Sequence, residues 1–586
     1  MNIKKARVLF FLSAAYMNPS HAAGWSAPQP GDVHNQGPII IQNVDVYDGV
    51  KPYLQKNATL LIDYVRTPDR ISGTGAVISG SDVGYFIKEI AINGKPLKTK
   101  LDLSQARTID GKHKVLMPGL IDTHAHLSWA NAPFVQAFAK KRKEPGSTLT
   151  LFDWVTEDTT HDPSSPDWIP NGVYGSKYEA KRNLSMGFTS IRETGGIAQT
   201  AQPSIDPKYT TLDSSSNSEP LKNRLILGQP GSRIWHSGSM VSATSGHADS
   251  ELLLYSQFQL IDNPEKMTVE QREEIAYELE KFGFTTADGA DSVLQAVRKQ
   301  LAKSADFIKI ATGGAISTPL DPLDATTMDA EEVKAAVTAA KGFNTYVTTH
   351  AYTGNTVVRD VALGVRMIEH ADLLNDAAAR AVKLRENLKD SSGTNIGPWL
   401  GVSAFFDNAY ANPKEGLAQI KQREVQQGTL KTYALIKKYG ISHIAWGSDA
   451  LFEKNGGEKS PKIIAHLPED LKPLKRWENK KGQFVNYSYS NADILKMVTS
   501  NNGKVLTMSG IRTPYNGTDG TYLKEGKIGQ ITPGAVADLL IVEGNPLKSL
   551  DFLYDVDANL HIIMKDGVVY KNDGIIPTST WGLNPL

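Results

Sequence analysis

The central part of the chain alternates short apolar runs with longer segments in which apolar residues recur every three or four positions. Short runs of this kind are typical of buried strands, and the longer periodic segments are typical of amphipathic helices. The helical pattern is clearest over residues 176–185, 269–282, 292–303, 330–341 and 376–388. We count eight strands, at residues 115–124, 188–193, 224–229, 306–310, 345–350, 365–370, 398–403 and 443–449.

Strands that alternate with helices predict a parallel sheet covered by helices, and eight such units favour a closed barrel. The predicted fold class is therefore α/β, with a (β/α)8 TIM barrel over residues 115–512. Both chain ends instead carry short apolar strands separated by Gly, Asp and Asn turns. Since the termini of a domain often lie close together, we predict that residues 36–114 and 513–575 form one small β-sandwich domain.

The N-terminus has the three-part layout of a secretory signal: basic residues at 4, 5 and 7, an apolar stretch at 8–16, and small residues at Ala22 and Ala23. Residues 1–23 are therefore predicted to be a signal peptide, and the mature protein to be secreted or periplasmic. An N-terminal helix is the alternative, because the apolar stretch is short. No later apolar run is long enough to cross a bilayer, so we expect no membrane contact in the mature form.

Charge and composition restrict the partners. The chain has 63 basic and 63 acidic residues, which leaves no net field to attract nucleic acid. We therefore expect a small-molecule substrate and no nucleic acid, and a homo-oligomer is compatible with this composition. The chain contains no cysteine, so any metal ligands must be nitrogen or oxygen atoms.

The first predicted strand ends in His124 and His126. Alternate side chains of a strand point to the same face, so the two imidazoles should converge in a way that suits a divalent metal. Asp122 is close enough in sequence to orient one of them. A pair of this kind also occurs on ordinary strands and loops, so it needs support from the rest of the chain.

That support comes from the other strands, because TIM barrels place reactive groups at the C-terminal ends of their strands. Five predicted strands end in such residues: His124 and His126 on the first, Lys309 on the fourth, His350 on the fifth, His370 on the sixth and Asp449 on the eighth. Six candidate residues on five strand ends favour a metal site over coincidence.

Lys309 lies between two isoleucines on a strand that should be buried, where an unpaired ammonium is costly. One resolution is a salt bridge. The other is that burial and nearby cations lower its pKa from about 10.4. The neutral amine would then react with carbon dioxide to give a carbamate whose two oxygens can bridge two metals. The residues alone leave both alternatives open.

Six segments, in this order, resemble the amidohydrolase superfamily: VLMPGLIDTHAHL, GFTSIRETGG, ADFIKIATGGAIST, THAYT, IEHA and IAWGSDA. Within it the chain is most similar to the imidazolonepropionase-like, Xaa-Pro dipeptidase and carboxypeptidase-like, and ochratoxinase-like group. The resemblance implies a centre of two divalent metal ions, with zinc favoured. His124, His126 and Asp449 would hold the first metal and His350 and His370 the second, with Lys309 as N6-carboxylysine and a hydroxide bridging them.

The implied activity is hydrolysis of a peptide-like amide bond, in a dipeptide or an N-acyl amino acid, by attack of the metal-bound hydroxide. Asp449 would take the hydroxide proton and pass it to the leaving amine. Tyr352 would donate to the developing oxyanion and bind substrate, although simple loop packing also explains it. His247 is implied to bind substrate, with a surface-loop histidine as the alternative. In these relatives an aspartate usually occupies the position of Glu193. The longer glutamate puts in doubt only a structural contact at this position, since the residue is not one of the implied metal ligands.

Two other activities compete with amide hydrolysis. The same metal centre could act as a lactonase or esterase, because the attacking hydroxide is the same. A non-catalytic binding protein is least favoured, since all six ligands are present.

Overall fold

The structure is a computed structural model. It describes residues 37–66, 70–71, 77–78, 82–127, 180, 182–196, 231–249, 268–269, 283–303, 305–316, 318, 321–402, 417–449, 456–510 and 527–573. The predicted signal peptide, the predicted strand at 224–229 and most of the predicted helix at 269–282 lie outside these ranges. Within them, no helix combines the length and the apolar character needed to cross a membrane.

Parallel strands make up the central part of the chain. One sheet has the order β10-β9-β8, with β8 at Leu120–Ala125, β9 at Phe188–Glu193 and β10 at Arg233–His236. A second sheet has the order β12-β11-β13-β14-β15-β16-β17. Its strands are β11 (Met240–Ser242), β12 (Phe284–Thr286), β13 (Ile308–Ala311), β14 (Val347–Thr353), β15 (Met367–Leu373), β16 (Trp399–Val402) and β17 (Ile444–Trp446). The sequence pattern did not predict β10, β11 or β12, which are only three or four residues long.

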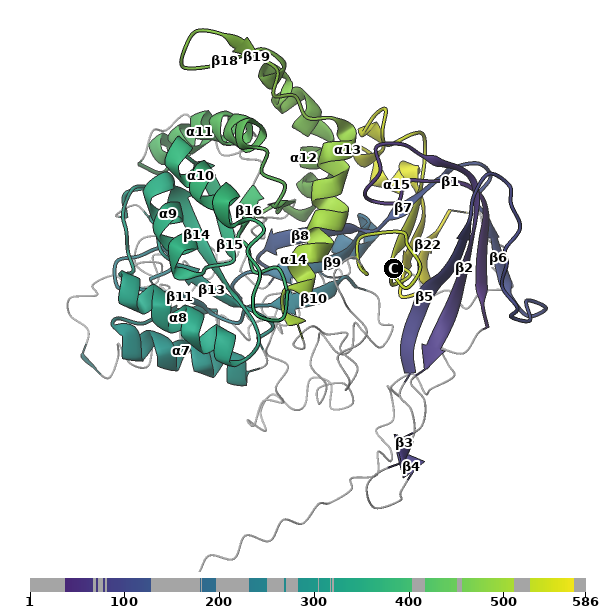
Figure 1. Cartoon of the computed structure of the whole chain (residues 1–586), viewed down its shortest axis with the longest axis horizontal. Helices are drawn as coiled ribbons and strands as arrows, with labels where there is room; N and C mark the ends of the chain where they lie inside the picture. The colour runs from purple at the N-terminus through teal and green to yellow at the C-terminus, as the bar shows by residue number, and fades with distance from the viewer. Residues whose placement is uncertain are drawn as a thin grey trace, which may run out of the picture.

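Helices cover the outer side of these strands (Figure 1). They are α7 (Ala290–Ala302), α8 (Ala330–Gly342), α9 (Gly354–Leu363), α10 (Asp376–Arg385) and α11 (Leu417–Tyr439). In α8 the buried residues include Val333, Ala336, Val337 and Ala340, which form one face at helical spacing. The helix begins with a capping box in which the Asp329 side chain accepts a hydrogen bond from the Glu332 N–H. The predicted alternation of strand and helix is therefore present.

The two parallel sheets meet where β8 lies beside β17. Among the described residues no strand ladder joins them, so the closed barrel of the sequence prediction is not formed by a continuous ring of strand pairs. Individual hydrogen bonds make the connection instead, and one of them runs from the Asp449 N–H to His124 O at 2.7 Å. Thr123 Oγ1 donates to Trp446 O at 2.9 Å, and Asn502 Nδ2 donates both to Ile121 O at 2.6 Å and to Trp446 O at 2.8 Å. The amide of Asn502 thus satisfies carbonyls that a ladder would otherwise use.

Strands from both chain ends form one mixed eight-stranded sheet, seen where the yellow and purple segments lie together in Figure 1. They are β1 (Ile39–Val46), β2 (Gln55–Arg66), β5 (Asp82–Ala91), β6 (Arg107–Asp110), β7 (Val115–Pro118), β20 (Leu539–Val542), β21 (Leu560–Lys565) and β22 (Val568–Asn572). β7 pairs antiparallel with β20, which joins the two ends directly. The stacking of two separate sheets that a sandwich requires stays a prediction.

The first predicted strand, at 115–124, is divided at Gly119. Its first half, β7, belongs to the chain-end sheet, and its second half, β8, belongs to the parallel strands. A Cβ atom added at Gly119 would lie only 2.3 Å from Thr189 Oγ1. The glycine therefore allows the chain to pass close to β9 as it changes sheets.

A buried charge network also connects the chain-end sheet to the parallel strands. Arg233 at the start of β10 donates to Asp538 Oδ2 at 2.5 Å and Oδ1 at 2.9 Å, and to Asp566 Oδ1 at 2.6 Å. Burial would lower the pKa of Arg233, but the charges of Asp538 and Asp566 raise it. Because two carboxylates bind the guanidinium, one of them in bidentate geometry, its buried charge is compensated.

The remaining described elements follow in the C-terminal third, apart from one short pair near the N-terminus. They are α12 (Gly456–Asp470), η5 (Lys472–Arg476), β18 (Trp477–Glu478), β19 (Phe484–Val485), α13 (Asn491–Lys496), η6 (Met497–Asn501), α14 (Asn502–Thr507), η8 (Asp551–Leu553), α15 (Val556–Asn559), and the pair β3 (Arg70–Ile71) and β4 (Val77–Ile78).

Candidate metal centre

The predicted ligands His124, His126 and Asp449 converge on one point. Asp449 Oδ1 lies 3.2 Å from His124 Nε2 and 3.3 Å from His126 Nε2. The two imidazoles of the first strand therefore share a face, as alternate strand positions predict. His370 joins them from β15, since one ligand atom each of His124, His370 and Asp449 lie within 4.8 Å of one another. The division of ligands between two metals stays a prediction.

A second group of rings extends this cluster. The ring centroids of His350 and His370 lie 4.5 Å apart, and those of His247 and His350 lie 4.1 Å apart. Tyr352 packs its ring 4.8 Å from His370 and 5.0 Å from His350. His247 and Tyr352 therefore lie beside the predicted ligands, and their expected roles in substrate binding stay predictions.

The imidazoles are arranged to offer lone pairs. Burial lowers the pKa of His124, and lowers those of His350 and His370 well below the usual range, so these rings are neutral. His126 Nδ1 lies 3.0 Å from Gly195 O, and His350 Nε2 lies 3.2 Å from Gly314 O. Because a carbonyl only accepts, each of these nitrogens carries the proton, so the other ring nitrogen is the one that could bind a metal.

Asp449 supplies negative charge at the centre. Burial would raise its pKa, but His124, His126 and His370 hold it well below the usual range, so the carboxylate is ionised. Asp449 has φ 51°, and His370 and Ala371 have φ 73° and 54°, all in the left-handed region. Such conformations cost about 1–3 kcal/mol each and concentrate at functional sites. Two of the predicted ligands, Asp449 and His370, therefore have strained backbones.

Lys309 lies on β13 with only 1% of its surface exposed. Its Nζ atom has no hydrogen-bond partner and no ion pair within the part of the chain that the structure describes. Burial lowers its pKa to about 8, against the opposing charges of Glu369 and Asp449. The direct salt bridge that would explain a structural lysine is therefore not formed among those residues.

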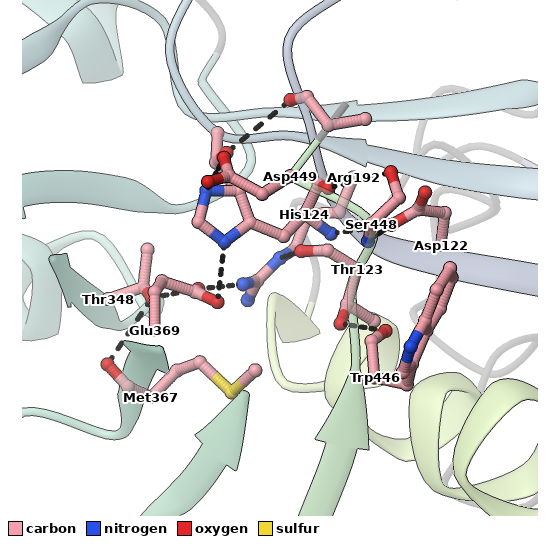
Figure 2. A network of polar contacts seen from close by, with 12 residues as sticks. Asp122, Thr123, His124, Arg192, Thr348, Met367, Glu369, Trp446, Ser448 and Asp449 are labelled. Carbon is pink, nitrogen blue, oxygen red and sulfur yellow. Dashed lines mark hydrogen bonds and ion pairs between the residues drawn. The ribbon is translucent and has the colours of Figure 1, made fainter. Parts of the chain in front are cut away.

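Sequence analysis missed Glu369, which holds His124 from the side opposite Asp449 (Figure 2). Glu369 Oε2 lies 3.3 Å from His124 Nδ1, while its other oxygen pairs with the Arg192 guanidinium and accepts from Thr348 Oγ1. Arg192 Nε also donates to Thr123 O at 2.6 Å. A carboxylate behind a ligand histidine fixes its ring and leaves Nε2 directed at the metal. The signal was present, since a glutamate within a buried strand requires a partner.

Asp122 has a different role from the predicted one. Its Oδ1 accepts from the backbone N–H of His124 at 2.9 Å and from that of Ser448 at 3.0 Å, so it does not orient an imidazole. It joins the backbone of β8 to the turn that carries Asp449. Burial raises the pKa of Asp122 to about 6, against the hydrogen bonds that lower it.

Glu193, where the resemblance implied an aspartate, is fully buried at the end of β9. One of its oxygens accepts from the backbone N–H of Leu127, just after the first two ligands. Burial raises its pKa well above the usual range. The longer side chain thus contacts the backbone that follows His126.

Comparisons with known proteins agree with this geometry. The profile of the amidohydrolase family matches residues 115–510. An ochratoxinase from Aspergillus niger is 22% identical over 522 residues, which make up 88% of this chain and 88% of that protein. The solved structure of that fungal ochratoxinase is 18% identical, with a TM-score of 0.57 over 92% of this chain and 96% of that chain.

Two other solved structures are similar over almost their whole length. An amidohydrolase is 26% identical, with a TM-score of 0.59 over 91% of this chain and 99% of that chain. A prolidase complexed with N-methylphosphonate-L-proline is 24% identical, with a TM-score of 0.60 over 91% of this chain and 100% of that chain. These similarities support a TIM-barrel-like α/β fold. Since the family profile spans more than half of the sequence, the chain belongs to the amidohydrolase family and is a hydrolase of carbon–nitrogen bonds.

Proposed function

We propose that this protein is a binuclear metal-dependent amidohydrolase that cleaves a peptide-like amide bond in a small molecule, either a dipeptide or an N-acyl amino acid. The names of two similar proteins, a prolidase and an ochratoxinase, support amide hydrolysis. Two divalent ions, with zinc favoured, would be held by His124, His126, His350, His370, Asp449 and carboxylated Lys309.

The observation that carries this proposal is the buried amine of Lys309, which has no partner among the described residues. An ammonium at that position would repel cations, and its lowered pKa increases the fraction of neutral amine. That amine adds to carbon dioxide and releases a proton, forming a carbamate with one negative charge and two oxygens. Neutral imidazoles, an ionised carboxylate and a carbamate together fit divalent metals that prefer nitrogen and oxygen ligands.

When bound, two divalent ions would supply an activated water and polarise the scissile carbonyl. The side chains provide the other steps. Asp449, whose carboxylate is ionised, accepts a proton from the attacking water and passes it to the leaving nitrogen. Tyr352, whose pKa burial raises well above the usual range, keeps its proton and donates a hydrogen bond to the developing oxyanion. His247 contacts the substrate.

Metal removal and a substrate panel test this proposal together. Elemental analysis should find about two divalent ions per chain. A chelator should abolish turnover and zinc should restore it, on a panel of dipeptides, N-acyl amino acids and lactones. Full activity in metal-free protein would contradict the mechanism. Hydrolysis of lactones alone would favour the lactonase alternative.

We also propose that the protein is exported, because residues 1–23 have the layout of a secretory signal. In the native host, the mature chain should begin close to Ala23 or Gly24. N-terminal sequencing of protein from the secreted or periplasmic fraction measures this directly. An intact Met1 on cytosolic protein would refute the signal peptide.

A further inference from the structure

The loop between β13 and α8 contacts two imidazoles of the site. Gly314 O lies 3.2 Å from His350 Nε2, and Thr318 Oγ1 lies 3.3 Å from His247 Nδ1. Since the rings of His247 and His350 pack 4.1 Å apart, a displacement of this loop would change both contacts together.

One ammonium group from a helix about a hundred positions further along the chain holds this loop. Lys421 on α11 donates from Nζ to Ala315 O at 3.0 Å, to Thr318 O at 2.6 Å and to Asp321 O at 2.5 Å, and lies 3.3 Å from Asp321 Oδ1. Its side chain is only 12% exposed. Asp321 Oδ2 accepts in turn from the Ala315 N–H at 3.0 Å, so the ion pair also closes the loop on itself.

Apolar contacts follow the same boundary between loop and helix. Ala315 and Leu323 of the loop pack with Val425, one turn after Lys421 on α11, and with Tyr352. The loop therefore touches both side chains that are expected to face the substrate, His247 and Tyr352. This second set of contacts does not depend on the charge of Lys421.

We propose that Lys421 is a positioning residue of the active site. By fixing the carbonyls of Ala315, Thr318 and Asp321, it sets the position of the Thr318 hydroxyl against His247. The inference rests on the proposed function, in which His247 binds substrate. Carbonyls that approach from several directions suit the three N–H groups of a compact ammonium better than the planar fork of an arginine.

The test removes the charge and keeps the length of the side chain. Lys421→Met retains an apolar stem, Lys421→Gln retains an amide donor group, and Lys431→Met, at an exposed position of the same helix, is the matched control. In zinc-loaded protein, hydrogen exchange of the Ala315, Ala325 and Thr327 amides should become about tenfold faster in Lys421→Met. The increase should be smaller in Lys421→Gln and absent in Lys431→Met.

Kinetics provide the second measurement, on any panel compound that the wild type hydrolyses. In protein measured with zinc in excess, Lys421→Met should lower kcat/KM about 100-fold, because small displacements in a site have effects of this size. Thr318→Val removes the contact with His247 directly. If Lys421 acts through Thr318, the two losses should not multiply. The kcat/KM of the double variant should then be little lower than that of the less active single variant.

Unchanged exchange of the loop amides in Lys421→Met, or losses that multiply in the double variant, would overturn the proposal. A loop that exchanges faster, together with non-additive kinetics, supports it. If the wild type hydrolyses no panel compound, the proposed function fails, and the exchange measurement still decides whether Lys421 holds the loop.

Discussion

Asp449→Asn is expected to lower kcat by about 100- to 10,000-fold, the contribution typical of a general acid–base group. Asp449 Oδ1 lies within 3.3 Å of the Nε2 atoms of both His124 and His126, where it can accept a proton next to the predicted metals. Asparagine tolerates the left-handed backbone found at this position, φ 51°, so the turn after β17 should keep its shape. The amide oxygen can still bind metal, but it cannot carry the proton.

Steady-state kinetics combined with elemental analysis separates a loss of proton transfer from a loss of bound metal. The variant should retain much of its metal while kcat collapses. Asp376→Asn is the control, because Asp376 pairs with Lys438 between α10 and α11 and is not one of the predicted site residues. Turnover by Asp449→Asn within a few-fold of wild type would show that another group transfers the proton.

Lys309→Ala is expected to lose both metal and activity. The variant removes the group that would become the bridging carbamate and leaves the buried cluster of imidazoles without that negative charge. A small carboxylate such as acetate or propionate, added with zinc, should partly restore both by occupying the vacated space. Titration of activity and bound metal against carboxylate concentration measures this restoration.

Lys309→Arg provides the contrast. Arginine fills the same space, stays charged at all accessible pH values and does not form the carbamate. It should lose metal, and carboxylates should not rescue it. If Lys309→Arg kept wild-type metal content and turnover, Lys309 would be a structural residue and the bridging role would be wrong.

The parts of the site that could be predicted depend on strand periodicity and strand ends. His124 and His126 converge because their spacing of two matches the period of a strand. His350 and His370 meet them because neighbouring parallel strands end at the same edge, and the register pairs His370 with Ala351, the residue after His350. These relations follow from local sequence once the strands are recognised.

The parts that could not be predicted depend on contacts across several strands. The pair of Arg192 and Glu369 links β9 to β15 and reaches His124 on β8, and no local pattern specifies that arrangement. Asp122 was assigned to an imidazole because only its distance along the chain was known. The division of the first strand at Gly119 was missed for a similar reason, since an apolar run reads the same whether it belongs to one sheet or to two.

The buried contacts of Arg233 have a consequence for protein engineering. Asp538 and Asp566 lie 305 and 333 positions further along the chain, yet both bind the same guanidinium. A chimaera that takes its C-terminal strands from a relative must therefore inherit both acids, or replace the arginine at the same time, because a buried charge left alone is costly. Recombination between relatives is thus constrained at three distant positions that must change as a set.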